Sequence, residues 1–307
     1  MSDPTPTPTP TPSPAPSGGP LRASDPLSQF QKNLGLLAEF AGTWVGGGFN
    51  VMSLPDFDST PPSTGPKAFR IKLNATRETL QFTPIGGAIP NRGAATDLAN
   101  NIGQTDIELF GLTYMQRVSD AVTNGGMHVE PGIWINIPAT TVLPAQGPTI
   151  VRMGNIPHGD SILAQSTFTA TVAGGPLIKP ASSLPVGPGV TPGYLARFSD
   201  PTLPLPPGLQ LPWVIDPNQA LLDDIARQTI VNTIVIGIST SAVGGILNIP
   251  FVVANANATR LDAIFWIETV QQPDGSTFMQ LQYTQTVILN FLGIDWPHIS
   301  VATLVKQ

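Results

Sequence analysis

The chain has 307 residues, of which 41% are apolar and 11% charged, and its formal net charge is −6. The 14 Lys and Arg residues are scattered, so the basic patch that marks a nucleic-acid-binding protein is absent. Cysteine is also absent, which excludes disulfides, thiolate metal sites and a cysteine nucleophile. Because single β-barrels can reach about 200–250 residues, one enlarged domain accounts for this length.

The N-terminal region is rich in Thr and Pro over residues 1–26, and it offers almost nothing to bury. We expect a solvated tail there, and a single domain over residues 27–307. The tail has neither a basic nor an apolar signal region, so we expect a cytoplasmic protein. Apolar residues recur at helical spacing from Leu27 to Phe40, which predicts a helix that plugs or flanks a barrel end.

Short apolar segments follow, separated by turn residues. With 34 Pro and 30 Gly, the chain is interrupted too often for long helices. Repeated segments of strand length predict an all-β meander. The expected strands of this part are Thr43–Met52, Ala68–Leu73, Thr79–Phe82, Ile107–Ser119, Gly126–Ile137, Thr149–Met153 and Ser161–Thr171.

The next part is less regular. Pro and Gly from Pro176 to Leu211 predict an irregular excursion, and Asp216-Pro217 predicts the start of a helix over Asn218–Gln228. The last two long apolar segments, Leu261–Gln271 and Thr277–Leu289, flank an Asp-Gly turn and predict a hairpin.

No formal charge occurs between Arg227 and Arg260. Polar residues and Pro250 interrupt this stretch, so we interpret it as two buried strands, Ile234–Ile238 and Ile249–Val253, rather than as a membrane-spanning helix. We therefore expect no membrane partner.

Three histidines, His128, His158 and His298, are the candidate ligands for a metal or for haem iron. His298 follows the last expected strand, where the ring could face a barrel mouth or lie on the surface. His128 either lines a pocket or is satisfied by Glu130 or the backbone, and His158 has turn residues on both sides. No Gly-x-Ser-x-Gly, phosphate loop or His-Glu-x-x-His motif occurs, so nucleophilic or metalloprotease chemistry has no support.

Four segments in order resemble the nitrobindin family of haem-binding β-barrels. They are Gly42-Thr43-Trp44-Val45-Gly46-Gly47-Gly48, Met127-His128-Val129-Glu130-Pro131-Gly132, Leu163-Ala164-Gln165-Ser166-Thr167 and Pro297-His298. Ser53-Leu54-Pro55 is similar to the Thr-x-Pro of that family, one residue closer to the Trp. Residues 172–258 read as a large insertion relative to the family barrel.

The resemblance implies an all-β fold, an antiparallel up-and-down barrel of about ten strands with an apolar interior. It further implies a b-type haem whose iron is bound by His298. It also implies a pocket to which Met127, His128, Gln165 and Ser53 contribute. Family members bind nitric oxide and isomerise peroxynitrite at a ferric haem, so peroxynitrite isomerase activity is an expectation here. The residues themselves leave two alternatives open: a carrier of an apolar small molecule such as a lipid or terpenoid, and a haem-dependent peroxidase-like or biosynthetic enzyme. Catalytic residues and oligomeric state are not specified by the sequence.

Overall fold

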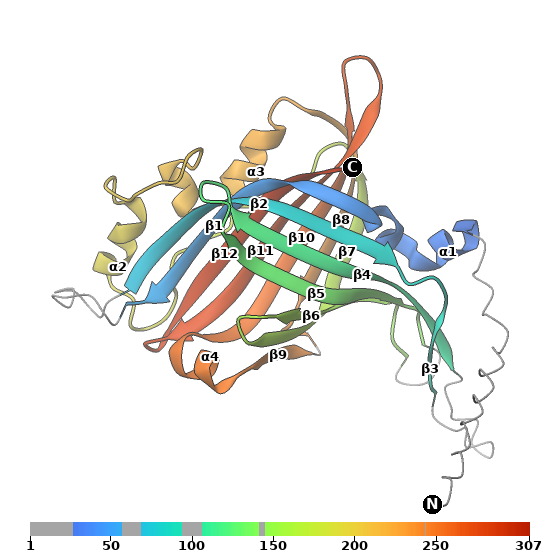
Figure 1. Cartoon of the computed structure of the whole chain (residues 1–307), viewed down its shortest axis with the longest axis horizontal. Coiled ribbons are helices and arrows are strands. Elements are labelled where there is room, and N and C mark those ends of the chain that lie inside the picture. The colour runs from blue at the N-terminus through green and yellow to red at the C-terminus, as the bar shows by residue number, and fades with distance from the viewer. Residues whose placement is uncertain (1–26, 57–68, 94–105, 141–144, 243) are drawn as a thin grey trace, which may run out of the picture.

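Ten strands close into an antiparallel ring in the computed structural model, which describes residues 27–56, 69–93, 106–140, 145–242 and 244–307 (Figure 1). The sheet has twelve strands in all, of which β3 and β9 lie outside the ring. The strands are β1 (Gly42–Pro55), β2 (Phe69–Pro84), β3 (Ile89–Asn91), β4 (Ile107–Asp120), β5 (Gly126–Ile137), β6 (Thr149–Ile156), β7 (Asp160–Ala173), β8 (Thr229–Ser239), β9 (Gly245–Asn248), β10 (Asn257–Gln271), β11 (Thr277–Phe291) and β12 (Ile294–Lys306).

Two pairings close the ring. The first strand pairs with the last, from Trp44 opposite Lys306 to Val51 opposite Ile299. Strand β2 pairs directly with β4. The short β3, which lies between them in the sequence, is therefore not part of the ring. Every neighbouring pair is antiparallel and the ring order follows the chain, so the expected up-and-down barrel of about ten strands is confirmed. The expected tail, residues 1–26, lies outside the described residues.

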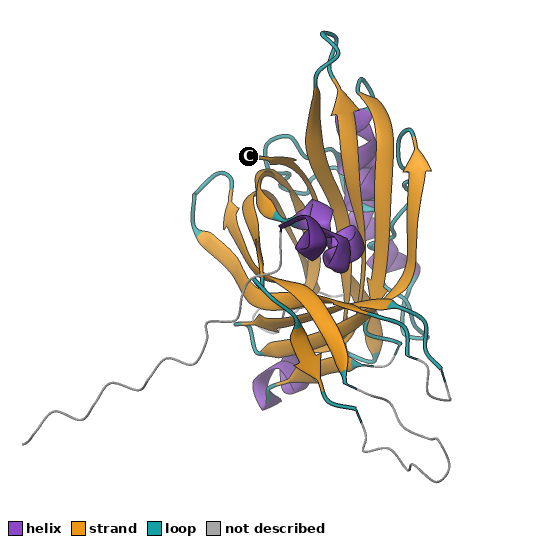
Figure 2. Cartoon of the chain, turned by 90° about the vertical axis from the view of Figure 1, so that its right-hand side faces the viewer, coloured by secondary structure: helices purple, strands orange, loops and turns teal. Residues whose placement is uncertain are grey.

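The barrel interior is filled by an apolar cluster whose members come from every strand of the ring, Trp44, Trp134 and Phe265 among them. Since successive residues of a strand face opposite sides, these positions identify the inward side of each strand. One end of the barrel is closed by α1 (Leu27–Leu34) and the 3-10 helix η1 (Gly35–Phe40). The Phe40 ring lies 5.2 Å from that of Trp134, and Figure 2 shows this helical segment in front of the ring of strands.

The Gly-rich opening of β1 allows its close approach to β12. A Cβ on Gly48 would lie 1.8 Å from the carbonyl oxygen of Val301, and one on Gly46 would lie 2.1 Å from that of Thr303. Neither position can therefore carry a side chain without separating the two strands that close the ring. This is the physical reason for glycine in the Gly-x-Trp-x-Gly-x-Gly segment.

The excursion after β7 covers the outer face of the barrel. Its helices lie beside the left-hand strands in Figure 1 and form a second core with side chains of β10, β11 and β12. There Trp296 stacks on Phe291 at 4.9 Å and lies 4.5 Å from the ring of Phe69. The helices of this part are α2 (Pro192–Ala196), η2 (Arg197–Ser199), η3 (Leu211–Val214) and α3 (Asn218–Ile225), and α4 (Pro250–Asn255) follows β9.

Some sequence-based boundaries are wrong. Ile249–Val253 is not a strand, because Pro250 occupies the first turn of α4. The expected insertion at 172–258 includes β8, which is a wall strand between β7 and β10. His298 lies within β12 rather than after the last strand. The described residues contain no helix that is both long and apolar enough to span a bilayer.

Candidate functional site

All three histidines lie toward one end of the barrel, opposite the helical plug, and we call this the histidine end. His298 is on β12, His128 on β5 and His158 in the turn between β6 and β7. The His128 and His158 rings are 5.5 Å apart. Burial, followed by the charges of His128 and His158, lowers the pKa of His298 to about 4. The imidazole of His298 is therefore neutral at ordinary pH.

His298 is held from the neighbouring strand by Asn50. The side-chain nitrogen Nδ2 of Asn50 lies 2.9 Å from Nε2 of His298 and donates to Oγ of Ser300 at 3.2 Å. These residues have the same parity as Trp44 on β1 and Ala302 on β12, which are in the interior cluster, so they face inward. The oxygen Oδ1 of Asn50 is buried and has no hydrogen-bond partner among the described residues.

A buried ion pair lies deeper in the barrel, on β5 and β6. The guanidinium nitrogen Nη2 of Arg152 is 2.7 Å from Oε1 of Glu130, and Nη1 donates to Oε1 of Gln285 at 2.7 Å. The hydroxyl of Tyr114 donates to Glu130 and accepts from Nε of Arg152 at 3.2 Å. Burial alone would raise the pKa of Glu130, but the charge of Arg152 and hydrogen bonds from His128 and Tyr114 lower it to about 2. The pair is thus charged.

This ion pair is linked to the histidine end through His128. The ring nitrogen Nε2 of His128 lies 3.3 Å from Oε2 of Glu130. Glu130 is one of the partners that we expected for His128 from the sequence. Glu130 therefore contacts His128 with one oxygen and Arg152 with the other. Residues on three strands, β4, β5 and β6, form one polar chain from the end of the barrel into its core.

Two glycines make room for this chain. Gly132 and Gly154 face each other on β5 and β6. A Cβ on Gly154 would lie 2.4 Å from the Tyr114 hydroxyl and 2.5 Å from Oε1 of Glu130, and one on Gly132 would lie 2.5 Å from the Tyr114 ring. The Tyr114 and Glu130 side chains consequently pack against bare backbone.

A second buried carboxyl, Glu78 on β2, forms no ion pair with any residue that the structure describes. It accepts hydrogen bonds from the Tyr283 hydroxyl at 2.6 Å and from Nε2 of Gln116 at 2.8 Å. Burial raises the pKa of Glu78 to about 7, although these two hydrogen bonds oppose the shift. Glu78 therefore exchanges a proton near neutral pH inside the barrel.

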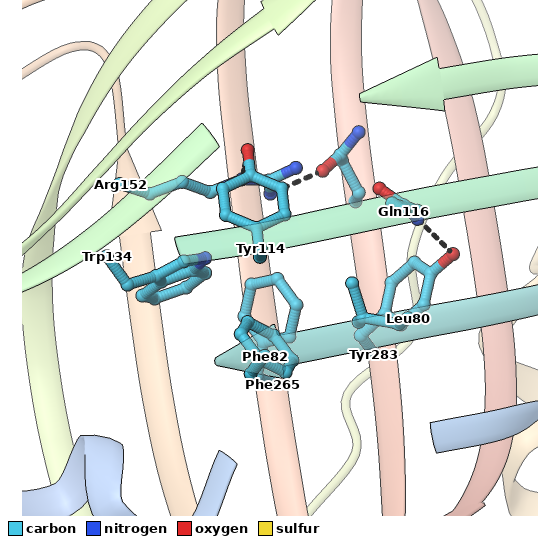
Figure 3. A pocket seen from close by; sticks show the side chains of 9 residues that line it. Leu80, Phe82, Tyr114, Gln116, Trp134, Arg152, Phe265 and Tyr283 are labelled. Atoms are coloured by element: carbon cyan, nitrogen blue, oxygen red, sulfur yellow. Dashed lines mark hydrogen bonds between the residues drawn. The ribbon is translucent and has the colours of Figure 1, made fainter. Parts of the chain in front are cut away.

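The core around these groups leaves little empty space, and Figure 3 shows the side chains that line a small cavity in it. The cavity that they surround has a volume of about 10 Å³, which is room for about one water molecule. Aromatic and polar side chains line it together: Leu80, Phe82, Tyr114, Gln116, Trp134, Arg152, Phe265, Tyr283 and Gln285. A larger ligand therefore has to bind nearer to an end of the barrel.

The structure brings together only part of the set predicted from the sequence. His128 and His298 both face inward at the histidine end. Gln165 alternates with the inward residues Ile162 and Ala164, which places it on the outward side of the wall. Met127 is the extra residue of a β-bulge opposite Val118 and Ser119, where the alternation is interrupted. Ser53 has the parity of Val51, which belongs to the second core, and its Oγ is buried without a hydrogen-bond partner among the described residues.

Sequence reasoning did not single out Asn50, Arg152, Tyr114 or Glu78. Each has the same parity as a buried aromatic or aliphatic residue on its strand. The alternation of apolar residues along these strands could therefore have predicted that the four side chains face inward. Within the described part of the chain, no three His, Asp or Glu side chains are arranged to hold a metal ion by themselves.

Comparison with known proteins adds a likeness of overall shape. No family model matches the chain, and no curated protein matches it either. Among solved structures, the crystal structure of Rv2717c from M. tuberculosis is similar, with a TM-score of 0.41 and 13% sequence identity. The likeness covers 90% of this chain and 97% of that chain.

Proposed function

We propose that the barrel binds b-type haem at its histidine end and that His298 supplies the axial ligand of the iron. The observation that carries this proposal is the neutral imidazole of His298, which faces inward near the end of the barrel. Neutral imidazole is the form of histidine that binds haem iron. A histidine on a protein surface is partly protonated at mildly acidic pH, whereas burial keeps the imidazole of His298 neutral and able to bind iron.

The surroundings of His298 fit a ligating histidine in a second respect. Such a histidine usually donates its other ring N–H to a protein oxygen, which fixes the orientation of the ring. Asn50 already contacts the ring, and its Oδ1 has no partner. Exchange of the two ends of the Asn50 amide would place this oxygen against the ring N–H.

The haem would have to lie toward the histidine end, because a cavity of about 10 Å³ in the core cannot hold a porphyrin. Bound haem iron would supply the coordination position at which nitric oxide binds and peroxynitrite is isomerised, the chemistry that the family resemblance implies. In this proposal His128 is the nearby polar group, and Glu130 holds it in place. The chain Glu130–Arg152–Tyr114 would keep a fixed charge pattern beneath the ligand.

A second candidate function is the carriage of an apolar small molecule. It is favoured by an open pocket of about 400 Å³ at the histidine end, which is lined in part by Ile156, Leu247 and Ile249. Pockets of about 300–1,000 Å³ with mainly apolar walls are typical of small-molecule sites.

Titration of the purified full chain with hemin tests the two functions. We expect a Soret band typical of histidine-ligated haem, its loss in His298→Ala, and its retention with altered nitric oxide binding in His128→Ala. Haem at a hundredfold excess over its dissociation constant would stabilise the wild type by about 2.7 kcal/mol. If His298→Ala binds hemin with the wild-type spectrum and affinity, the axial assignment is wrong. Extraction of lipid from a protein that takes up no hemin would favour the carrier.

A further inference from the structure

An apolar surface segment lies at the histidine end, where β9 leads into α4. Four side chains within seven residues of sequence are largely exposed, and we call them the apolar rim: Leu247 (78%), Ile249 (49%), Phe251 (71%) and Val253 (53%). Single exposed apolar residues are ordinary, but a contiguous group of large ones marks an interaction surface. Helix α4 lies at the lower edge of the molecule in both views (Figures 1 and 2).

The apolar rim carries no charge. No Asp, Glu, Lys or Arg occurs from Gln228 to Thr259, and the first charge after this stretch, Arg260, forms an ion pair with Asp262 at 2.8 Å. The chain as a whole has a net charge of −6. The rim therefore matches a neutral partner surface, and the protein as a whole is repelled by an anionic one.

The rim also borders the open pocket of about 400 Å³, because Leu247 and Ile249 line both. The one acidic side chain in the pocket wall is Asp160, whose Oδ1 is buried and has no hydrogen-bond partner among the described residues. An unpartnered buried carboxylate oxygen is costly unless a cation or a hydrogen-bond donor meets it. The pocket wall thus combines apolar residues and neutral polar ones (Asn155, Ser161 and Asn248) with one carboxylate that suits a cationic group.

The size of the rim argues against a second copy of the chain. Its four side chains, at roughly 200 Å² each and 49–78% exposed, offer about 500 Å². A stable protein interface covers about 800 Å² on each partner. A lipid bilayer has no such minimum, since each apolar side chain that enters it adds to binding.

We propose that the apolar rim docks on a zwitterionic phospholipid surface, and that the pocket behind it receives one lipid with its cationic headgroup beside Asp160. This contact requires no spanning helix, and it replaces the expectation that the protein has no membrane partner. It is independent of haem binding at His298, because it uses the rim and pocket residues alone.

Co-sedimentation of the full-length protein with phosphatidylcholine vesicles tests the proposal. We expect the wild type to bind, and the double variant Leu247→Ser/Phe251→Ser to bind at least tenfold more weakly. The matched control is Leu177→Ser, because Leu177 is 80% exposed and follows β7, at the opposite end of the barrel. All changed residues are exposed, and circular dichroism of each variant verifies folding. Salt should have little effect, and adding anionic phosphatidylglycerol should weaken binding.

Two further measurements locate the contact. Phe251→Trp should show fluorescence quenching by brominated phosphatidylcholine, whereas Leu177→Trp should not. Asp160→Asn should weaken binding to phosphatidylcholine vesicles, and an unchanged affinity would refute the headgroup assignment. Absence of wild-type binding, or equal binding by the double variant, would overturn the docking surface. The docking surface would also be overturned if the protein does not bind vesicles and sedimentation analysis shows a dimer that depends on Phe251.

Discussion

Asn50 and His298 are 248 residues apart in sequence, yet their side chains meet at 2.9 Å between β1 and β12. The strand pairing that closes the barrel therefore also positions the candidate ligand. Because the contact uses Nε2 of His298, the amide of Asn50 decides which ring nitrogen is open to an incoming group.

Changes at Asn50 should separate an orienting role from simple packing. Asn50→Leu removes the hydrogen-bonding partner of His298 and should weaken hemin affinity by about 10–100-fold, the usual effect of losing such a partner. Asn50→Asp keeps an oxygen for the ring N–H and should retain most of the affinity. Hemin titrations of the three proteins measure this. Equal hemin affinities of the Asn50→Leu and Asn50→Asp variants would show that Asn50 does not orient the His298 ring.

The ion pair of Glu130 and Arg152 should be a large contributor to stability. Its two side chains are 0% and 3% exposed, and removing one member leaves the other buried without a counter-charge. We expect Glu130→Gln and Arg152→Met each to lower the free energy of unfolding by about 3–5 kcal/mol. The double variant should lose less than the sum of the single losses. Urea unfolding measures all three, and strict additivity would contradict the predicted coupling.

Glu78 should make stability fall as the pH rises. Its pKa is about 7 in the folded protein against 4.5 for an exposed glutamate, so between these values the folded state holds a proton that the unfolded chain has released. The free energy of unfolding therefore decreases with rising pH through this window, by about 1.4 kcal/mol per pKa unit at most. His298, whose pKa is lowered to about 4, has the opposite effect below pH 6.5.

The difference between wild type and Glu78→Gln isolates the Glu78 contribution from that of His298. Glutamine keeps an oxygen for the Tyr283 hydroxyl and cannot ionise, so the variant should gain stability relative to the wild type from about pH 4.5 to about pH 7. Unfolding measured at several pH values tests this. A difference that is constant with pH would show that Glu78 titrates normally.

Gly154→Ala should disturb the polar chain from the backbone side. The new Cβ would fall within 2.5 Å of Tyr114 and Glu130. Moving these buried groups should cost about 1–3 kcal/mol of unfolding free energy. Gly126→Ala is the matched control, because no atom lies within 4 Å of its Cβ position at the start of β5. Similar losses in both variants would indicate a backbone effect rather than the predicted clash.

The strands of the barrel could be predicted from the sequence more completely than the side-chain contacts in its interior. The expected strand Gly126–Ile137 has the bounds of β5, and the Asp-Gly hairpin forms with Gly275 at a φ of +86°. Strand β12 was missed because Pro297 interrupts its pattern, although proline there only removes one donor. The contact of Glu130 with His128 could be predicted because the two residues are close together on one strand. The partners of Arg152 and Asn50 lie on other strands, so these contacts depend on strand register, which one sequence does not specify.

The pairing of β1 with β12 has a consequence for how the protein is made. Residues around Trp44 are synthesised early, but they find their partners on β12 only when the chain up to Lys306 has been made. Until then β1 and β11 each present an open edge, which can pair with other chains. We expect closure to be late and slow, as for other folds dominated by long-range contacts, and chaperones to be needed most in the interval before β12 is available to pair with β1.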